Sequence, residues 1–394
     1  MTQANIITRE QAVYFGEEST FGQTPAGSFP NAMTRTIVSE PIVADGATQE
    51  MLDVNDVRVR RLDAIQPVHG LKIASKFGMS MLLKATPSAS QLTSSNSAGS
   101  LTPRLFLRQG LGQEYAVHGS TVATGTSSTQ FDVASGHGSR FRIGTLIAVE
   151  ISGAMEWAQV TAISTDTLTV SPALSGTPST SAIVRNLYNY AAAESHTTSM
   201  TAQIAYVGDS TAQYTFNGCH GGVKFNWGGE WGKLASMMLD LTAVSYTGPS
   251  NQSISTATAT DEMGVSYAFT PQVYLTTSIT RGTTTACEKV EVDLPASFEM
   301  VRDPAATQTV TAVVDTAGRP RAGKVTVTLR YDNDLPVAFA ADTAYKLAVV
   351  WRVGSGTTAS FWIWYVDAMK LTAQPKMTKV GERLYIDQIG RAHV

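Results

Sequence analysis

The sequence predicts a mainly β protein, and three observations carry that prediction. Charged residues make up 15% of the 394-residue chain, against roughly 25% in typical soluble domains, and Ser and Thr take their place. Thr suits the pleated, half-buried surface of a strand. Wherever a period is visible, apolar residues mostly alternate with polar ones, as in strands. Helical periodicity is confined to two short segments.

The clearest alternation lies in the C-terminal half. Residues 324–331 place apolar side chains on one face and charged or hydroxyl side chains on the other, and residues 290–294 alternate in the same way. Half-buried strands of this kind belong to antiparallel sheets or barrels. Residues 345–353 and 360–366 flank a Gly-Ser-Gly turn, which predicts a hairpin. The second of these strands is apolar on both faces, so it is either central to a sandwich or meets a neighbouring subunit.

The two helical segments predict short helices laid over a sheet. Leu234, Met237, Met238 and Leu241 fall at i, i+3, i+4 and i+7, an apolar stripe at helical spacing. Residues 75–85 form the second candidate helix.

Residues 119–187 look inserted, because Gly/Ser/Thr-rich stretches bound them at 119–129 and 175–181. Four short strands are predicted between these stretches, at residues 130–133, 146–151, 155–163 and 167–170. Short strands joined by tight turns predict a small β-barrel of their own.

Removing the insertion leaves about 325 residues, enough for two halves of about 160 each, which predicts a duplicated domain. A short echo supports duplication, since Gly229-Glu230 and Gly381-Glu382 each follow a β segment. The predicted domains are residues 1–118 together with 188–248, the inserted barrel at 119–187, and a second domain at 249–394.

Composition excludes several classes of protein. A net charge of −3 and a pI near 6.1 argue against a protein that grips nucleic acid through clustered Lys and Arg. Cys219 and Cys287 cannot build a disulfide framework and lack metal-ligand spacing. Neither a signal peptide nor a run of 18 apolar residues is present, so we expect folding in a cytoplasm without a membrane segment.

The sharpest enzymatic motif is Gly208-Asp209-Ser210, since a Gly-Asp-Ser turn carries the nucleophile in one class of esterases. Those enzymes place the turn after an early strand and supply Asp-x-x-His near the C-terminus. Here the turn lies in mid-chain and the late His393 has no such Asp, while Gly-Asp is ordinary turn chemistry. We therefore expect no catalytic residue, no metal and no cofactor, with an esterase built on Ser210 as the alternative.

Residues 15–26, Phe-Gly-Glu-Glu-Ser-Thr-Phe-Gly-Gln-Thr-Pro-Ala, resemble the N-terminal signature of tail tube proteins from long, non-contractile bacteriophage tails. In that family an aromatic-Gly-x-Glu-Ser-aromatic-Gly-x-Thr-Pro run opens the chain. The two phenylalanines would anchor an ordered arm, the glycines would permit turns and the proline would hold the exit extended. The motif residues are Phe15, Gly16, Glu17, Phe21, Gly22 and Pro25.

The order of the following segments is also similar to this family. A strand is expected at residues 34–43, then a long charged loop at 44–66, and residues 67–71 lead into the candidate helix at 75–85. Residues 216–223 are similar to the strand-Gly-Cys turn of the family.

The resemblance implies β-sandwich or barrel domains that form rings stacked into a hollow tube in the virion tail, assembled in the host cytoplasm. The implied partners are other copies of the chain, the tape-measure protein and genomic DNA in the lumen, and tail terminator and distal tail proteins at the ends. Two domains favour a trimeric ring that imitates a hexamer, with a true hexamer as the alternative. The inserted barrel would lie outside the tube. Other virion components, such as a tail terminator or a decoration protein, remain alternatives.

The segment 44–66 is the candidate for the ring-to-ring contact, because opposite charges in it could register successive rings. A solvated surface loop is the other interpretation. Three arginines, called here the arginine triplet, are Arg58, Arg60 and Arg61, and the acidic candidates are Asp53, Asp56 and Asp63.

Overall fold

The computed structural model describes residues 6–18, 21–22, 34–36, 48–54, 66–73, 75–83, 106–108, 111–115, 118–192, 199–208, 212–228, 234–250, 268, 270–294, 298–302, 310–315, 322–330, 344–371, 376–380 and 383–393. Strands dominate these residues, which confirms the predicted mainly β fold class. Helical conformation is limited among them to residues 106–108 and 111 and to the 3₁₀ turns Gly138–Arg140 and Gly356–Thr358.

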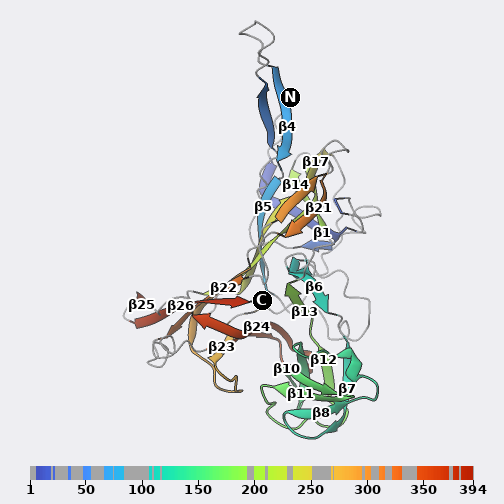
Figure 1. Ribbon diagram of the computed structural model, residues 1–394, viewed down its shortest axis with the longest axis vertical. Helices are drawn as coiled ribbons and strands as arrows, with labels where there is room; N and C mark the ends of the chain where they lie inside the picture. Colours follow the sequence, from blue (N-terminus) through green and yellow to red (C-terminus); the bar gives the residue numbers. More distant parts are fainter. Residues whose placement is uncertain are drawn as a thin grey trace.

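Fourteen strands form one hydrogen-bonded sheet network, which occupies the upper and left-hand parts of Figure 1. They are β1 (Ile6–Glu17), β2 (Thr34–Thr36), β5 (Ser75–Leu82), β14 (Met200–Gly208), β15 (Ala212–Gly228), β16 (Ser236–Ala243), β17 (Ser245–Ser250), β18 (Gln272–Thr276), β19 (Cys287–Leu294), β22 (Ala322–Arg330), β23 (Tyr345–Val353), β24 (Ser360–Leu371), β25 (Lys376–Val380) and β26 (Arg383–His393).

The long strand β15 joins the two parts of this network. Its first part, up to Cys219, pairs with β14 and β17, and its second part, from His220, pairs with β16 and β19. Beyond β14 the network continues through β1 to β2, and beyond β19 it continues through β22, β26, β24 and β23 to β18. One strand therefore links the N-terminal half of the chain to the C-terminal half.

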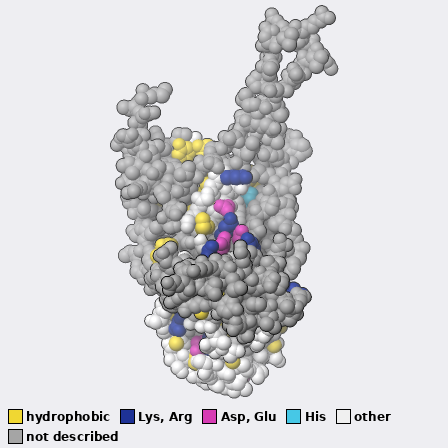
Figure 2. All heavy atoms as spheres, turned by 90° about the vertical axis from the view of Figure 1, so that its left-hand side faces the viewer, with side chains coloured by type: hydrophobic (Ala, Val, Ile, Leu, Met, Phe, Trp, Pro, Cys, Tyr) yellow, Lys and Arg dark blue, Asp and Glu magenta, His cyan; other side chains and the backbone are white. Residues whose placement is uncertain are grey.

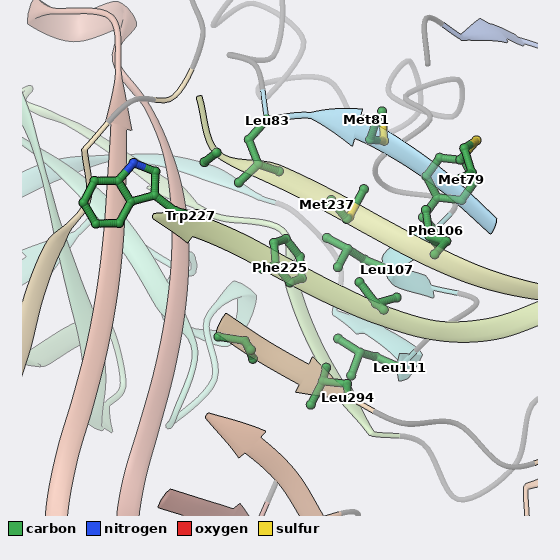
Figure 3. Packing of buried hydrophobic residues seen from close by; sticks show 14 of the residues in the cluster. Met79, Met81, Leu83, Phe106, Leu107, Leu111, Phe225, Trp227, Met237 and Leu294 are labelled. Atoms are coloured by element: carbon green, nitrogen blue, oxygen red, sulfur yellow. The ribbon is translucent and has the colours of Figure 1, made fainter. Parts of the chain in front are cut away.

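The main core extends over both parts of the network, from Val13 and Ile204 to Val327 and Val349. Val290, Val292 and Leu294 on β19 and their neighbours on β22 are buried at every second position, as the alternation predicts. In Figure 3 Leu107 and Leu111, from the short helical segment, lie close to Phe225 of β15 and Leu294 of β19. The same buried cluster includes residues of both halves of the chain.

Both predicted helices are wrong, because both segments are strands. The segment at 75–85 contains β5, in which Phe77, Met79 and Met81 are buried. The segment around Met238 contains β16, where Met237, Leu239 and Leu241 point inward and Met238 is 43% exposed. Leu239 completes a period of two that competes with the helical period. Backbone pairing of β16 with β15 on one side and β5 on the other favours the strand.

Three further strand pairs stand apart from the network. They are β3 (Thr48–Val54) with β4 (Gln66–Ile73), β6 (Gly112–Tyr115) with β13 (Asn189–Ala192), and β20 (Phe298–Arg302) with β21 (Val310–Asp315). The predicted loop at 44–66 is therefore wrong in two places. Residues 48–54 form β3, and residue 66 begins β4. Of the strand predicted at 34–43, residues 34–36 form β2 and the rest lie outside the described residues.

The predicted small barrel is confirmed as a closed barrel in the order β10-β11-β8-β7-β12-β9, at the lower end of Figure 1. Its strands are β7 (Gly119–Gly125), β8 (Gln130–Val133), β9 (Leu146–Ile151), β10 (Ala154–Ser164), β11 (Thr167–Ser171) and β12 (Ile183–Asn186). It has six strands where four were predicted, because the Gly/Ser/Thr-rich flank supplies β7 and the exit supplies β12. Tight turns at Gly153 (φ 78°) and Thr165 (φ 54°) join β9 to β10 and β10 to β11.

The strand that is apolar on both faces is β24, and it contacts a different core on each side. Trp362 and Trp364 pack against the main core. Phe361, Ile363 and Tyr365 pack against a smaller cluster that includes Trp157 of the barrel. Within one chain, β24 is thus covered on one face by the sheet core and on the other by the inserted barrel.

The proposed division at residues 248 and 249 stays a prediction, since strands from both sides of it share the sheet network. Among the described residues, no helix is long and apolar enough to cross a membrane.

Candidate assembly surfaces

Glu18, directly after β1, is a buried carboxylate held in a cradle of donors. Its Oε1 accepts the Thr201 hydroxyl at 2.8 Å and the Gly218 backbone N–H at 2.7 Å. Its Oε2 accepts the Gly22 backbone N–H at 2.6 Å and the Ser199 hydroxyl. Four donors around two oxygens suit an ionised carboxylate, which only accepts.

The two glycines of this cradle have left-handed backbone conformations. Gly22 has φ 72° and Gly218 has φ 65°, values that favour glycine. A Cβ on Gly218 would also lie 2.9 Å from the side chain of Val244. Each glycine therefore turns the chain so that its N–H points at Glu18. As a result, the carboxylate fastens the turn after β1 to the middle of β15.

The surroundings of the cradle are apolar and tightly packed. Phe15 is fully buried and meets Phe106 edge to face, with ring centroids 4.8 Å apart. The Phe21 ring lies 6.2 Å from the His220 ring. Burial and the nearby Glu18 charge raise the pKa of the Cys219 thiol, so this cysteine is a buried structural residue.

The cradle brings together the two segments that carried the family resemblance, residues 15–26 and 216–223. Phe15 and Gly16 lie on β1 and are buried, Phe21 and Gly22 form the turn, and Pro25 lies outside the described residues. Glu17 makes a half-exposed ion pair with Arg108 at 2.7 Å.

Glu18 was missed as a site residue. Strand alternation could not separate it from Glu17, because residues 13–16 of β1 are buried on both faces. The available signal was the Gly-Glu-Glu-Ser run itself, which places a carboxylate just before a turn.

The hairpin of β3 and β4 extends away from the rest of the molecule at the top of Figure 1. Its strands pair with each other and with no other described strand. Its backbone register sets Asp53 opposite Pro67 and Met51 opposite His69. Of the six charged residues proposed for the ring contact, Asp53 is on β3. The arginine triplet, Asp56 and Asp63 lie outside the described residues.

The barrel is fixed to the sheet by apolar packing, which includes Trp157, Met155 and Ala148, and by polar contacts. Trp157 of β10 lies edge-on to Tyr274 and Tyr365, with centroids 5.8 and 6.4 Å apart. Arg281 donates to the Trp157 carbonyl at 2.7 Å and pairs with Glu156 at 3.3 Å. The inserted barrel is therefore a docked part of the molecule.

Acidic and basic side chains lie side by side on the flank seen in Figure 2. Two ion pairs on the exposed sheet surface are of this kind, Lys224 with Asp240 at 3.4 Å and Lys289 with Glu291 at 3.2 Å. Neighbouring opposite charges of this kind do not form a basic patch of the sort that grips phosphates.

One arrangement on the barrel has the residue types of a hydrolase. Ser120 Oγ lies 2.9 Å from His137 Nδ1, and the Asp166 carboxylate interacts electrostatically with His137. Both Asp166 oxygens, however, accept backbone N–H groups of Gly136 and Gly138, which also lowers the pKa of this carboxyl. The Asp166 carboxylate thus holds a turn.

Ser210 lies outside the described residues. Among the residues that the structure describes, no group of three metal-ligating side chains comes together.

No known protein family and no curated protein matches the chain by sequence.

Proposed function

We propose that the chain is a structural subunit of a bacteriophage tail tube, which assembles into rings that stack around the tape-measure protein and the DNA. Tail terminator and distal tail proteins would close the two ends. The proposal joins the resemblance of residues 15–26 to the geometry of the described strands.

The projecting hairpin of β3 and β4 is the observation that carries the proposal. An isolated two-stranded hairpin is marginally stable in water. A hairpin that projects away from the main sheet network is therefore expected to need a partner surface. Its seven- and eight-residue strands reach about 25 Å, enough to contact a neighbouring subunit. A contact between different surfaces of identical subunits does not close on itself when directed along an axis, and it propagates as a filament.

Open sheet edges supply the contacts within a ring. Among the described strands, β5 pairs only with β16, and β2 pairs only with β1. Unpaired edges invite pairing with another chain unless they are protected. In a ring, such edges pair with those of the neighbouring subunits. With two sheet regions in each chain, three subunits would give a ring of sixfold appearance, and six remain the alternative.

Sedimentation velocity over a concentration series tests the proposal. We expect the average mass to grow without a plateau as concentration rises, because stacking is open-ended. Replacing the arginine triplet with glutamate should leave small closed rings. A wild-type protein that stays monomeric, and that hydrolyses model esters in a manner abolished by Ser210→Ala, would contradict the tail tube and favour the esterase.

A further inference from the structure

One edge of β24 is open over part of its length, among the strands that the structure describes. β23 pairs with β24 along residues 360–366, whereas β26 pairs with the opposite edge only at residues 369–371. Residues 363–366 therefore have a described strand on one side only. Successive residues of a strand direct their backbone N–H and C=O groups to opposite edges, so two of these four residues direct theirs to the open edge. Outside the sheet pairing, no described backbone group bonds to them.

A cavity of about 240 Å³ lies along this edge. Its wall includes all six residues from 360 to 365. Because side chains alternate between the two faces of a strand, a cavity on one face would touch only every second residue. Contact with six residues in succession, on a strand whose other edge is covered by β23, places the cavity beside the open edge. Each of the six is partly exposed, whereas residues 347–351 of β23 are buried, so solvent reaches β24 but not the middle of its neighbour.

The cavity has apolar walls on both sides of β24. On one side the wall consists of main-core residues, among them Leu107, Leu111 and Phe225. On the other side it consists of barrel residues, among them Leu146 and Ala148. A molecule beside the edge of β24 therefore meets apolar side chains on both of its faces.

An extended peptide segment matches both properties of this site. Another strand can pair with a row of open backbone groups, because its own donors and acceptors have the same spacing. A bound strand projects alternate side chains to each side, so it must be apolar at successive positions to suit both walls. The open edge strands β2 and β5 lack this property, since β2 is Thr-Arg-Thr and β5 carries Lys76, Gly78 and Ser80 at alternate positions. A second copy of the chain therefore does not supply the segment through these two strands.

We propose that the open edge of β24 binds an extended segment of another protein, apolar at successive positions, which pairs with residues 363–366 as an added strand. One row of its side chains packs against the main core, and the other row packs against the barrel. This site is independent of the tail tube proposal, because all its walls belong to one chain.

Fluorescence anisotropy with labelled peptides and the full-length chain tests the site. The parent peptide has six residues, alternately valine and phenylalanine, between pairs of lysines. Backbone N-methylation of the valines blocks one edge of the peptide, methylation of the phenylalanines blocks the other, and methylation of all six blocks both. The apolar side chains are the same in all four peptides.

We expect the peptide with both edges blocked to bind at least about tenfold more weakly than the parent, because it cannot pair with β24. At least one peptide with a single blocked edge should bind about as tightly as the parent, since β24 offers one edge and needs only one. Equal affinities for all four peptides would overturn the proposal, because the cavity would then bind apolar side chains alone. Loss of binding with both single-edge peptides, or no binding of the parent up to millimolar concentration, would also overturn it.

Two variants locate the binding. Ile363→Lys places a charge on the edge strand, a device by which natural proteins prevent strand pairing, and should abolish binding of the parent peptide. Met238→Lys is the matched control, because Met238 is 43% exposed on β16 and is not part of the cavity wall. It should leave binding unchanged, and circular dichroism and the melting temperature check that both variants fold. Binding that survives Ile363→Lys in a folded protein would place the peptide elsewhere and overturn the proposal.

Discussion

The substitution Glu18→Gln tests whether one buried carboxylate fastens β1 to β15. Glutamine has nearly the same shape but replaces one acceptor oxygen with an NH₂ group. Turning that group toward Ser199 is the least costly arrangement, because this hydroxyl can rotate to accept. The Gly22 N–H, which donates to Glu18 at 2.6 Å, then loses its acceptor.

The expected cost follows from these contacts. A buried donor left without an acceptor costs about 1–3 kcal/mol. The cost falls at the lower end here because Gly22 is only partly buried. The bonds from Thr201 and Gly218 change from charged to neutral acceptors, a loss of about 1 kcal/mol each. The total is about 2–4 kcal/mol, a large share of a typical stability of about 5–15 kcal/mol.

Urea-induced unfolding of wild-type, Glu18→Gln and Glu17→Gln proteins measures this cost. Glu17 is the matched control, because it is the adjacent residue of the same type and its ion pair with Arg108 is 31–36% exposed. Such a pair contributes about 0–1 kcal/mol. Equal losses for the two variants, or a loss below about 1 kcal/mol for Glu18→Gln, would refute the role assigned to the cradle.

Three further outcomes are expected. Replacing the arginine triplet with glutamate should shorten or abolish stacked assemblies while far-ultraviolet circular dichroism stays unchanged, and unaltered stacking would reject the ring-contact role. Trp157→Ala should destabilise the chain by about 3–5 kcal/mol and free the barrel for limited proteolysis, whereas Ile143→Ala, at a position 65% exposed, should do neither. Burial raises the pKa of the Cys287 thiol from 9.0 to about 12. At pH 8 the Cys287 thiolate is therefore about 1,000-fold scarcer in the folded chain than in the unfolded chain. A disulfide reagent should label Cys287 that much more slowly in buffer than in urea. Similar labelling rates in the folded and unfolded chains would contradict the burial of the Cys287 thiol.

The sequence predicted those parts of the fold that depend on a local period. Val290, Val292 and Leu294 face a single core, so the period of two is visible in the residue types. The hairpin of β23 and β24 was predicted from another local signal, the glycines of the turn between two apolar strands. The small barrel was predicted from short strands joined by tight turns.

Elsewhere the pattern of apolar residues fitted both a helix and a strand, or showed no period at all. Met237, Met238 and Leu241 fit a helix, and only pairing with β15 and β5 makes β16 a strand. Strand β7 was hidden because its Gly- and Thr-rich sequence resembles a loop. Both are cases in which contacts distant in sequence decide the structure.

Part of the candidate site could be predicted from the sequence, and part of it could not. The motif at residues 15–26 was found from its residue types. Glu18 could not be singled out, because its donors Thr201 and Gly218 are about 200 residues away in sequence.

Electron microscopy of the purified chain tests self-assembly most directly. Negatively stained samples at rising concentration should contain hollow rods of constant diameter with a regular axial repeat, and an averaged reconstruction should show the hairpin of β3 and β4 against the next ring. Particles that remain single globular molecules at every concentration would contradict the tail tube.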